Sequence, residues 1–165
     1  MVSTNGHTRF FEVQYFWQNR LSWIVWLVCI PTVWLLYRDD AIHGLFAFVL
    51  ILLMIGLIAL VMLSKLTTEV SASGISFRMT PFHRTSRTYA WSDIDSVEIR
   101  KYSPIREYGG WGIRMGLQGT AYNIKGNIGL QIVTQEGKRI LIGTQKPEEL
   151  NEVLDHLGKL TPAAS

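Results

Sequence analysis

The stretch Leu45–Leu63 reads LFAFVLILLMIGLIALVML, nineteen uncharged residues of which fourteen are Leu, Ile, Val or Phe. A helix needs about 20 such residues to cross the roughly 30 Å of hydrocarbon in a bilayer. An apolar helix can also lie inside a large soluble protein, but a chain of 165 residues is too small to surround it. The stretch therefore predicts a membrane-spanning helix.

A second uncharged run precedes the first. Leu21–Tyr37 reads LSWIVWLVCIPTVWLLY, and these seventeen residues are just long enough to span if the preceding residues extend them. A cleavable signal peptide is the alternative, but no small-residue cleavage site follows and another apolar run comes almost at once. We expect a flexible segment over residues 1–15 and a transmembrane hairpin over 16–64, with spans at 18–37 and 43–64.

The charges around the two runs predict the orientation of the hairpin. Only residues 38–44 connect the runs, so both chain ends must lie on one side of the membrane. Arg20 and Lys65 flank that side, whereas Arg38 lies in the connection, and positive residues favour the cytoplasmic side. We therefore predict a multi-pass protein with both termini in the cytoplasm. Neither run contains Asp, Glu, Lys, Arg or His, which argues against a transporter or pump.

The chain changes character after Lys65. Short apolar-polar alternations such as Val97-Glu98-Ile99-Arg100 are typical of half-buried strands. Gly129–Thr134 and Lys138–Gly143 flank a short glycine-containing loop and predict a hairpin. From Pro147 onward, apolar residues at helical spacing predict an amphipathic helix. About seven strands and a final helix indicate a bent antiparallel sheet or open barrel that the helix covers.

Seven short segments carry a further signal, and in chain order they are Gly74-Ile75-x-Phe77-Arg78, Pro81-Phe82-His83-Arg84, Trp91-x-x-Ile94, Val97-Glu98-Ile99-Arg100, Tyr108-Gly109-Gly110-Trp111-Gly112-Ile113-Arg114, Ala121-Tyr122-Asn123 and Ile142-Gly143-Thr144-Gln145-x-Pro147-Glu148. Their order resembles that of small bacterial membrane proteins, largely of unknown function, in which a pleckstrin-homology-like domain follows two membrane spans. The resemblance implies an α+β, mainly-β barrel of seven antiparallel strands with a C-terminal capping helix over residues 65–160 and a tail over 161–165. It also implies attachment to the inner face of the bacterial inner (cytoplasmic) membrane.

Residues 65–146 hold twelve Lys and Arg against six Asp and Glu. One interpretation is attraction to anionic lipid headgroups, where each basic residue contributes about 1 kcal/mol. The alternative is that these side chains simply occupy solvated strand faces. The candidates for anionic-surface binding are Arg78, Arg84, Arg87, Arg100 and Lys101. Nucleic-acid binding is not expected, because no helix-turn-helix, stacking platform or zinc spacing accompanies the charge. Inositol-phosphate binding is not carried over from the broader fold, because the loop at residues 71–74 has no basic residue.

The segment Gly109–Arg114 is rich in glycine but lacks the Gly-Lys-Ser/Thr ending of a phosphate-binding loop. A glycine-rich turn or bulge is the favoured interpretation. The alternative is a small ligand or peptide held against Trp111, with Arg106 or Arg114 engaging an anionic end.

Catalytic groups are scarce in the second half of the chain. It contains no cysteine, and its histidines, His83 and His156, are not in a zinc-ligand pattern. Asp93 and Asp95 fit a solvated pair better than an acid/base dyad, because nothing around them indicates a buried cleft. We therefore predict no enzyme activity, no catalytic residue, no metal and no cofactor.

These observations favour a non-enzymatic, membrane-anchored pleckstrin-homology-like domain that presents a protein- or lipid-interaction surface at the cytoplasmic face. Its expected partners are the lipid bilayer and a membrane or cytoplasmic protein, with no nucleic acid. The alternative is a small accessory subunit of a larger membrane transport or enzyme complex, in which the hairpin packs against larger subunits.

Overall fold

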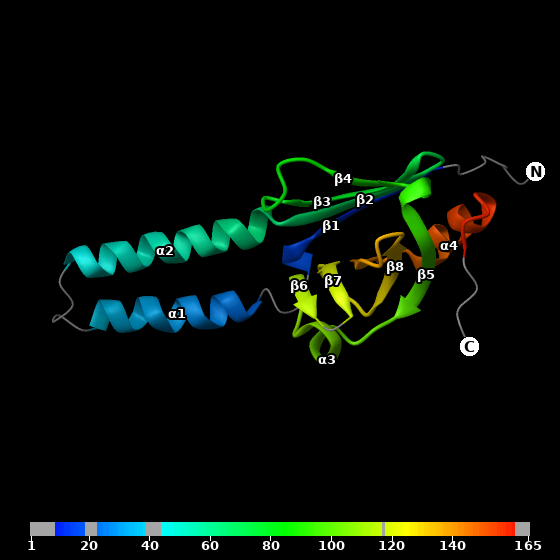
Figure 1. Ribbon diagram of the computed structural model, residues 1–165. Helices are drawn as coiled ribbons and strands as arrows, with labels where there is room; N and C mark the ends of the chain where they lie inside the picture. Colours follow the sequence, from blue (N-terminus) through cyan, green and yellow to red (C-terminus); the bar gives the residue numbers. More distant parts are fainter. Residues whose placement is uncertain (1–8, 19–22, 39–43, 117, 161–165) are drawn as a thin grey trace, which may run out of the picture. The chain divides into compact units, whose positions relative to one another are not determined.

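The computed structural model describes residues 9–18, 23–38, 44–116 and 118–160 (Figure 1). The chain divides into two compact units. We call Tyr15–Ser64 the helical segment, and the described residues up to Gln14 and from Lys65 onward the β-sheet domain. The predicted tail at 161–165 lies outside the described residues, as do residues 19–22 and 39–43, on which part of the predicted orientation depends.

The helical segment contains a short 3-10 turn, η1 (Phe16–Gln18), and two helices, α1 (Trp23–Arg38) and α2 (Gly44–Leu63). Within the described chain, α2 is the one helix that is long and apolar enough to cross a membrane. None of the residues from Phe46 to Leu63 is buried. The segment therefore leaves its largest apolar surface uncovered by protein.

The predicted two-helix transmembrane hairpin at the N-terminus is wrong. Only α2 meets the criterion for a span in the described chain. The sixteen residues of α1 rise about 24 Å at 1.5 Å per residue, which is short of the roughly 30 Å of hydrocarbon. A strand, β1 (Phe10–Tyr15), also precedes the helices, so residues 10–15 are not part of a flexible segment that leads into them.

The β-sheet domain is built from two sheets. The first has four strands in the order β1-β2-β3-β4, and the second has five in the order β5-β8-β9-β7-β6. The remaining strands are β2 (Lys65–Ser71), β3 (Gly74–Thr80), β4 (Arg87–Ala90), β5 (Ile94–Lys101), β6 (Gly112–Gly116), β7 (Gly119–Asn123), β8 (Ile128–Thr134) and β9 (Arg139–Gly143). Three short elements complete the domain, and they are η3 (Trp91–Asp93), α3 (Pro104–Tyr108) and α4 (Pro147–His156).

This architecture corrects the predicted barrel of about seven antiparallel strands. The described chain forms sheets of four and five strands, and β7 pairs with β9 in parallel, with Tyr122 opposite Ile142. The fold is β-rich, but it is not the single antiparallel barrel that we expected. A parallel pair joins strands that are distant along the chain, so local alternation cannot reveal it.

The core of the β-sheet domain collects apolar side chains from both sheets and from α4. Phe10, Leu66 and Ile75 are fully buried in the first sheet, and Leu141 in the second. From α4, the residues Leu150, Val153 and Leu154 are buried, as expected for the apolar face of an amphipathic helix. α4 lies within the range predicted for the final helix.

The start of β3 requires glycine. Gly74 has a φ of 147°, and a Cβ atom there would collide with the carbonyl oxygen of Tyr89 on β4. The register pairs Gly74 with Ala90, the last residue of β4. The close approach of the two strands therefore depends on the missing side chain.

Candidate functional site

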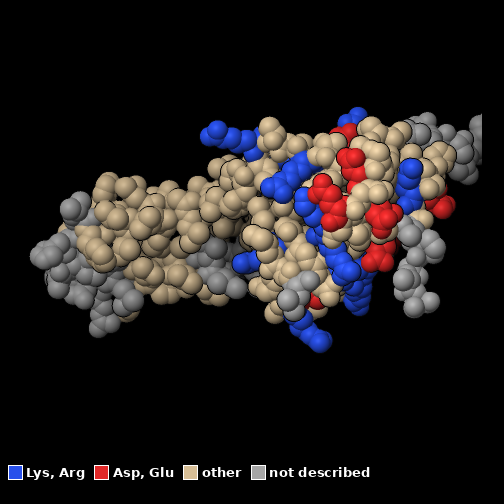
Figure 2. All heavy atoms as spheres, viewed as in Figure 1, with Lys and Arg blue, Asp and Glu red and all other residues tan. Residues whose placement is uncertain are grey.

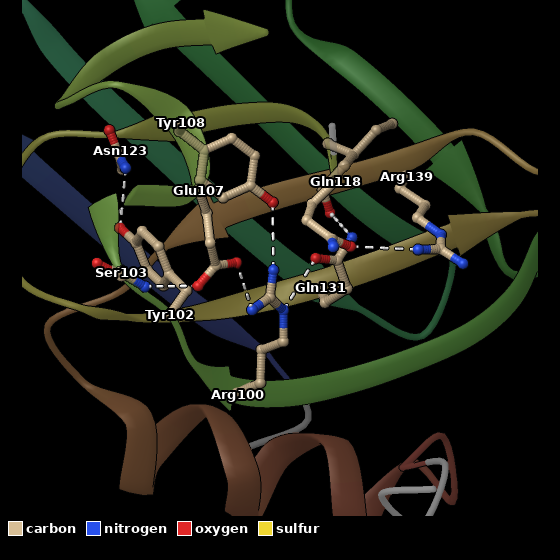
Figure 3. Close-up of polar contacts among 10 residues, drawn as sticks. Arg100, Tyr102, Ser103, Glu107, Tyr108, Gln118, Asn123, Gln131 and Arg139 are labelled. Atoms are coloured by element: carbon tan, nitrogen blue, oxygen red, sulfur yellow. Dashed lines mark hydrogen bonds and ion pairs between the residues drawn. The ribbon is translucent and has the colours of Figure 1, made fainter. Parts of the chain in front are cut away.

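Arg100 is the centre of a polar cluster that joins β5, β8 and α3 (Figure 3). Its Nε donates a hydrogen bond to Gln131 Oε1 at 3.1 Å, and its Nη2 donates to the Tyr108 hydroxyl at 3.2 Å. Its Nη1 forms an ion pair with Glu107 Oε2 at 2.9 Å. These three acceptors hold the guanidinium in place and compensate its charge.

Glu107 also fixes the start of α3. Its Oε1 accepts a hydrogen bond from the Ser103 backbone N–H at 2.6 Å, one of the donors that a helix start leaves unpaired. Burial opposes the charged carboxylate, but the bonds from Ser103 and Arg100 together lower the pKa of Glu107. The carboxylate therefore stays ionised and paired.

Two tyrosines complete the cluster. The Tyr102 hydroxyl accepts a hydrogen bond from Asn123 Nδ2 at 2.9 Å, and the rings of Tyr102 and Tyr108 meet edge to face at 6.0 Å. Asn123 Oδ1 in turn accepts from the Gly112 N–H at 2.9 Å. Burial raises the pKa of Tyr102 to about 12 and also raises the pKa of Tyr108. Both hydroxyls stay protonated at neutral pH, so neither offers a general base.

The five predicted anionic-surface residues fall into two groups. Arg78, Arg84 and Arg87 lie on β3, β4 and the loop between them, whereas Arg100 and Lys101 end β5 on the other sheet. Of the five, Arg100 forms an ion pair with Glu107 and is the centre of the polar cluster described above. Figure 2 shows that on one face of the β-sheet domain the acidic side chains gather mainly in one area, while basic side chains project at several places.

The group on β3 and β4 keeps its charge uncompensated. Arg78 Nε donates to the His83 carbonyl at 3.2 Å, and Arg87 Nη1 donates to the Tyr122 hydroxyl at 2.8 Å. Arg84 is exposed. In the part of the chain that the structure describes, no carboxylate forms an ion pair with any of these three.

An aromatic cluster supports the loop between β3 and β4. The Tyr122 ring lies 4.7 Å from Phe77 and 5.4 Å from His83. His83 Nδ1 accepts a hydrogen bond from the Met79 N–H at 3.3 Å. Burial, and then the charge of Arg87, lower the pKa of His83. Sequence reasoning missed this supporting role of His83 and Tyr122, because the contact joins strands of different sheets.

The predicted ligand contacts are only partly brought together. Arg114 Nε donates to the Trp111 carbonyl at 3.1 Å, and Trp111 Nε1 donates to the Gly126 carbonyl at 3.2 Å. Arg106 lies on α3, and no hydrogen bond between described residues joins it to Trp111 or Arg114. Trp111 thus fastens a glycine-rich turn, which agrees with the favoured interpretation of this segment.

Sequence reasoning also missed a buried carboxylate on β1. Glu12 is 5% exposed; its Oε2 accepts from Thr144 Oγ1 at 2.7 Å and its Oε1 from the Gln145 N–H at 2.8 Å. Gln14 Nε2 donates to the Gly143 carbonyl at 2.7 Å. The first strand is therefore fastened to the end of β9.

The acidic pair singled out in the sequence, Asp93 and Asp95, lies at the surface of the β-sheet domain. Asp93 ends η3 and Asp95 lies on β5, and both are exposed. Within residues 9–18, 23–38, 44–116 and 118–160, no group of three or more His, Cys, Asp and Glu side chains could hold a metal ion. Comparison of the chain with protein-family models, curated proteins and solved structures found no match.

Proposed function

We propose that this protein is a non-enzymatic, membrane-anchored interaction domain. The helical segment holds it in a lipid bilayer, and the β-sheet domain is presented at one face of that bilayer. The observation that carries the proposal is α2, whose apolar residues from Phe46 to Leu63 are all left unburied. A soluble monomer rarely leaves so large a continuous apolar surface in water, whereas a bilayer covers it.

The connections of the helical segment support presentation at a single face. The Phe16 N–H donates to the Ser64 carbonyl at 2.9 Å, so the start and the end of the segment lie side by side. The strands on either side of the segment, β1 and β2, are neighbours in one sheet. We therefore propose that both strands lie at one face of the bilayer, and that this is the cytoplasmic face, as the flanking charges predict.

The polar cluster around Arg100 supports the non-enzymatic part of the proposal. Its arginine, carboxylate and hydroxyl groups are engaged with one another. Groups that satisfy one another in this way stabilise a fold. The exposed arginines of β3 and β4 lie outside this cluster and are therefore available to form an interaction surface.

Membrane extraction of the full-length chain tests the anchor. We expect the chain to stay with bacterial membranes after an alkaline carbonate wash. Leu53→Lys should release a large fraction, because a lysine at a helix centre costs about 2.5–3.5 kcal/mol on insertion. The matched control is Ile105→Lys, since Ile105 is similarly exposed but lies on α3. Recovery of the unaltered chain in the carbonate supernatant would contradict the proposal.

An accessory subunit of a larger membrane complex is the second candidate function. A groove of about 380 Å³ in the helical segment favours it. The groove is lined by Val28, Cys29, Thr32, Leu50, Leu53, Met54 and Leu57. Such an apolar groove fits a helix of another subunit. Purification in mild detergent with quantitative mass spectrometry separates the two functions, because only an accessory subunit would retain a stoichiometric transporter or enzyme.

A further inference from the structure

The register of the first sheet places one loop at the attachment point of the helical segment. β2 pairs with β3 so that Lys65 lies opposite Thr80 and Ser71 lies opposite Gly74. Lys65 directly follows Ser64, the last residue of the helical segment. The residues after Thr80, Pro81–Ser86, therefore leave the sheet at the end where the helical segment is joined. The turn before Gly74 lies roughly 20 Å away, at about 3.3 Å per residue.

This loop combines an apolar and a basic side chain at its surface. Phe82 is 54% exposed and Arg84 is exposed. His83, between them, instead packs its ring against Phe77 and Tyr122. The His83 N–H also donates to the Met79 carbonyl at 2.8 Å. His83 therefore fixes the loop against the domain, while the side chains of Phe82 and Arg84 remain exposed at its surface.

The loop lies in a long acid-free stretch of the β-sheet domain. No Asp or Glu occurs between Glu69 and Asp93, while Arg78, Arg84 and Arg87 all fall within it. Their charges have no carboxylate partner among the described residues. A partner that supplies negative charge and also accepts the exposed ring of Phe82 would complement this surface.

We propose that Pro81–Ser86 is a second membrane contact, which docks on anionic phospholipid headgroups of the bilayer that holds α2. Phe82 enters the interfacial region, where an aromatic ring is favourable. Arg84, supported by Arg78 and Arg87, pairs with lipid phosphates. The inference rests on the proposed function, because the anchor brings this end of the sheet to the membrane. A free phosphate would satisfy the arginines but not the ring.

Site-directed spin labelling of the full-length chain tests the contact. A nitroxide, itself apolar, is attached at Phe82→Cys in a Cys29→Ser background, since Cys29 is the only native cysteine. The chain is reconstituted into vesicles of phosphatidylcholine alone or with phosphatidylglycerol. Accessibility to oxygen, which favours lipid, is compared with accessibility to an aqueous nickel chelate. We expect the label to be shielded from nickel with phosphatidylglycerol, and inorganic phosphate added to phosphatidylcholine vesicles to have no effect.

A second label position provides the matched control. Glu136 lies in the turn between β8 and β9, where the Gln135 N–H donates to the Asp93 carbonyl at 2.9 Å. Asp93 follows the end of β4 that pairs with Gly74, so Glu136 belongs to the opposite end of the domain. A label at Glu136→Cys should stay accessible to nickel on both kinds of vesicle.

Arginine variants test the headgroup chemistry. We expect Arg84→Gln to reduce the docked population of the loop about fivefold, which is the contribution of one basic residue near an anionic surface. Arg106→Gln, which removes an exposed arginine from α3, should change it little. A docked population that is unchanged in Arg84→Gln overturns the inference.

Vesicle flotation separates the two possible failures. If the chain floats with vesicles but the label at position 82 stays accessible to nickel, the loop contact is wrong and the anchor stands. If the label is equally shielded with and without phosphatidylglycerol, recognition of anionic headgroups is wrong. If the chain does not float at all, the anchor and the loop contact are both wrong.

Discussion

The helical segment and the β-sheet domain handle polarity in opposite ways. In the helical segment, large apolar side chains face outward, with Leu27 72% and Leu53 64% exposed. In the β-sheet domain, polar side chains are buried, with Glu12 5% and Asn123 0% exposed. Water penalises both arrangements unless something compensates them. The comparison shows that the two regions need different surroundings.

The compensation is present in only one of the two regions. Both carboxylate oxygens of Glu12 accept hydrogen bonds, and Asn123 uses both ends of its amide. None of the residues of α2 from Phe46 to Leu63 is buried by the rest of the chain. The burial of Glu12 and Asn123 is therefore compensated within the β-sheet domain, whereas the apolar helix requires a medium outside the chain.

The largest expected difference in stability is between two variants that each place one carboxylate, one in the β-sheet domain and one in the helical segment. Leu141→Asp buries an unpaired carboxylate at a site that is 0% exposed, and we expect a loss of at least about 4 kcal/mol of stability. Resistance of the β-sheet domain to protease in detergent measures the loss. Leu53→Asp, on the exposed surface of α2, should leave that resistance unchanged. If protease digests the two variants equally fast, the proposed difference between the two regions is wrong.

The second effect concerns the buried carboxylate. Glu12→Ala leaves the Thr144 hydroxyl and the Gln145 N–H without their acceptor, and we expect a loss of about 3 kcal/mol. The urea midpoint of the detergent-solubilised chain measures it. The control is Glu136→Ala, which removes an exposed pair with Lys138 and should shift the midpoint little. Similar midpoints for the two variants would show that burial of Glu12 is unimportant.

The third effect concerns the Arg100 cluster. Arg100→Ala removes three hydrogen bonds and leaves Glu107 without its ion-pair partner, so we expect a loss of about 2 kcal/mol. In Arg100→Lys the ammonium group keeps a positive charge beside Glu107, but it cannot bond to all three acceptors. The loss of stability should therefore be smaller than in Arg100→Ala. Thermal unfolding followed by circular dichroism checks the order. A lysine variant as unstable as the alanine variant would argue against the role of Glu107.

The smallest effect is a pH dependence from His83. Its pKa in the folded protein is lowered from 6.5 by burial and by Arg87, so the unfolded chain binds the proton more readily. Stability should therefore be at its full value above 6.5 and should fall as the pH drops toward the lowered folded pKa. Urea midpoints of the native chain and of His83→Gln measure this, and the variant should lose this part of the slope. If the dependence of stability on pH is unchanged in His83→Gln, it must come from another titratable group.

Part of the fold could be predicted from the sequence because the signals were local. The apolar run ending at Leu63 predicted α2 through composition, and the glycine-containing loop at Gly137 predicted the hairpin of β8 and β9. The strand β1 was missed because its pattern is inverted. Phe11 and Tyr15 are its exposed large residues, while Glu12 and Gln14 face the core.

The candidate site was less predictable than the elements. Arg100 and Arg84 look alike in the sequence, yet one is paired with Glu107 and the other is exposed. Glu107 lies seven residues from Arg100, and Gln131 lies thirty-one away. The number of charged residues in a sequence cannot show which arginines are paired with carboxylates in the folded protein.

The sequence by itself determined the apolar helix α2 and the acid-free, arginine-bearing stretch between Glu69 and Asp93, because both depend only on which residues are neighbours in the chain. The tertiary structure alone decided that β1 joins the first sheet, that β7 and β9 run parallel, and that Glu12 is buried. Helix hydrogen bonds close within four residues, whereas the bond from Thr144 to Glu12 spans 132 positions. Contacts of that kind exist only once the whole β-sheet domain has folded.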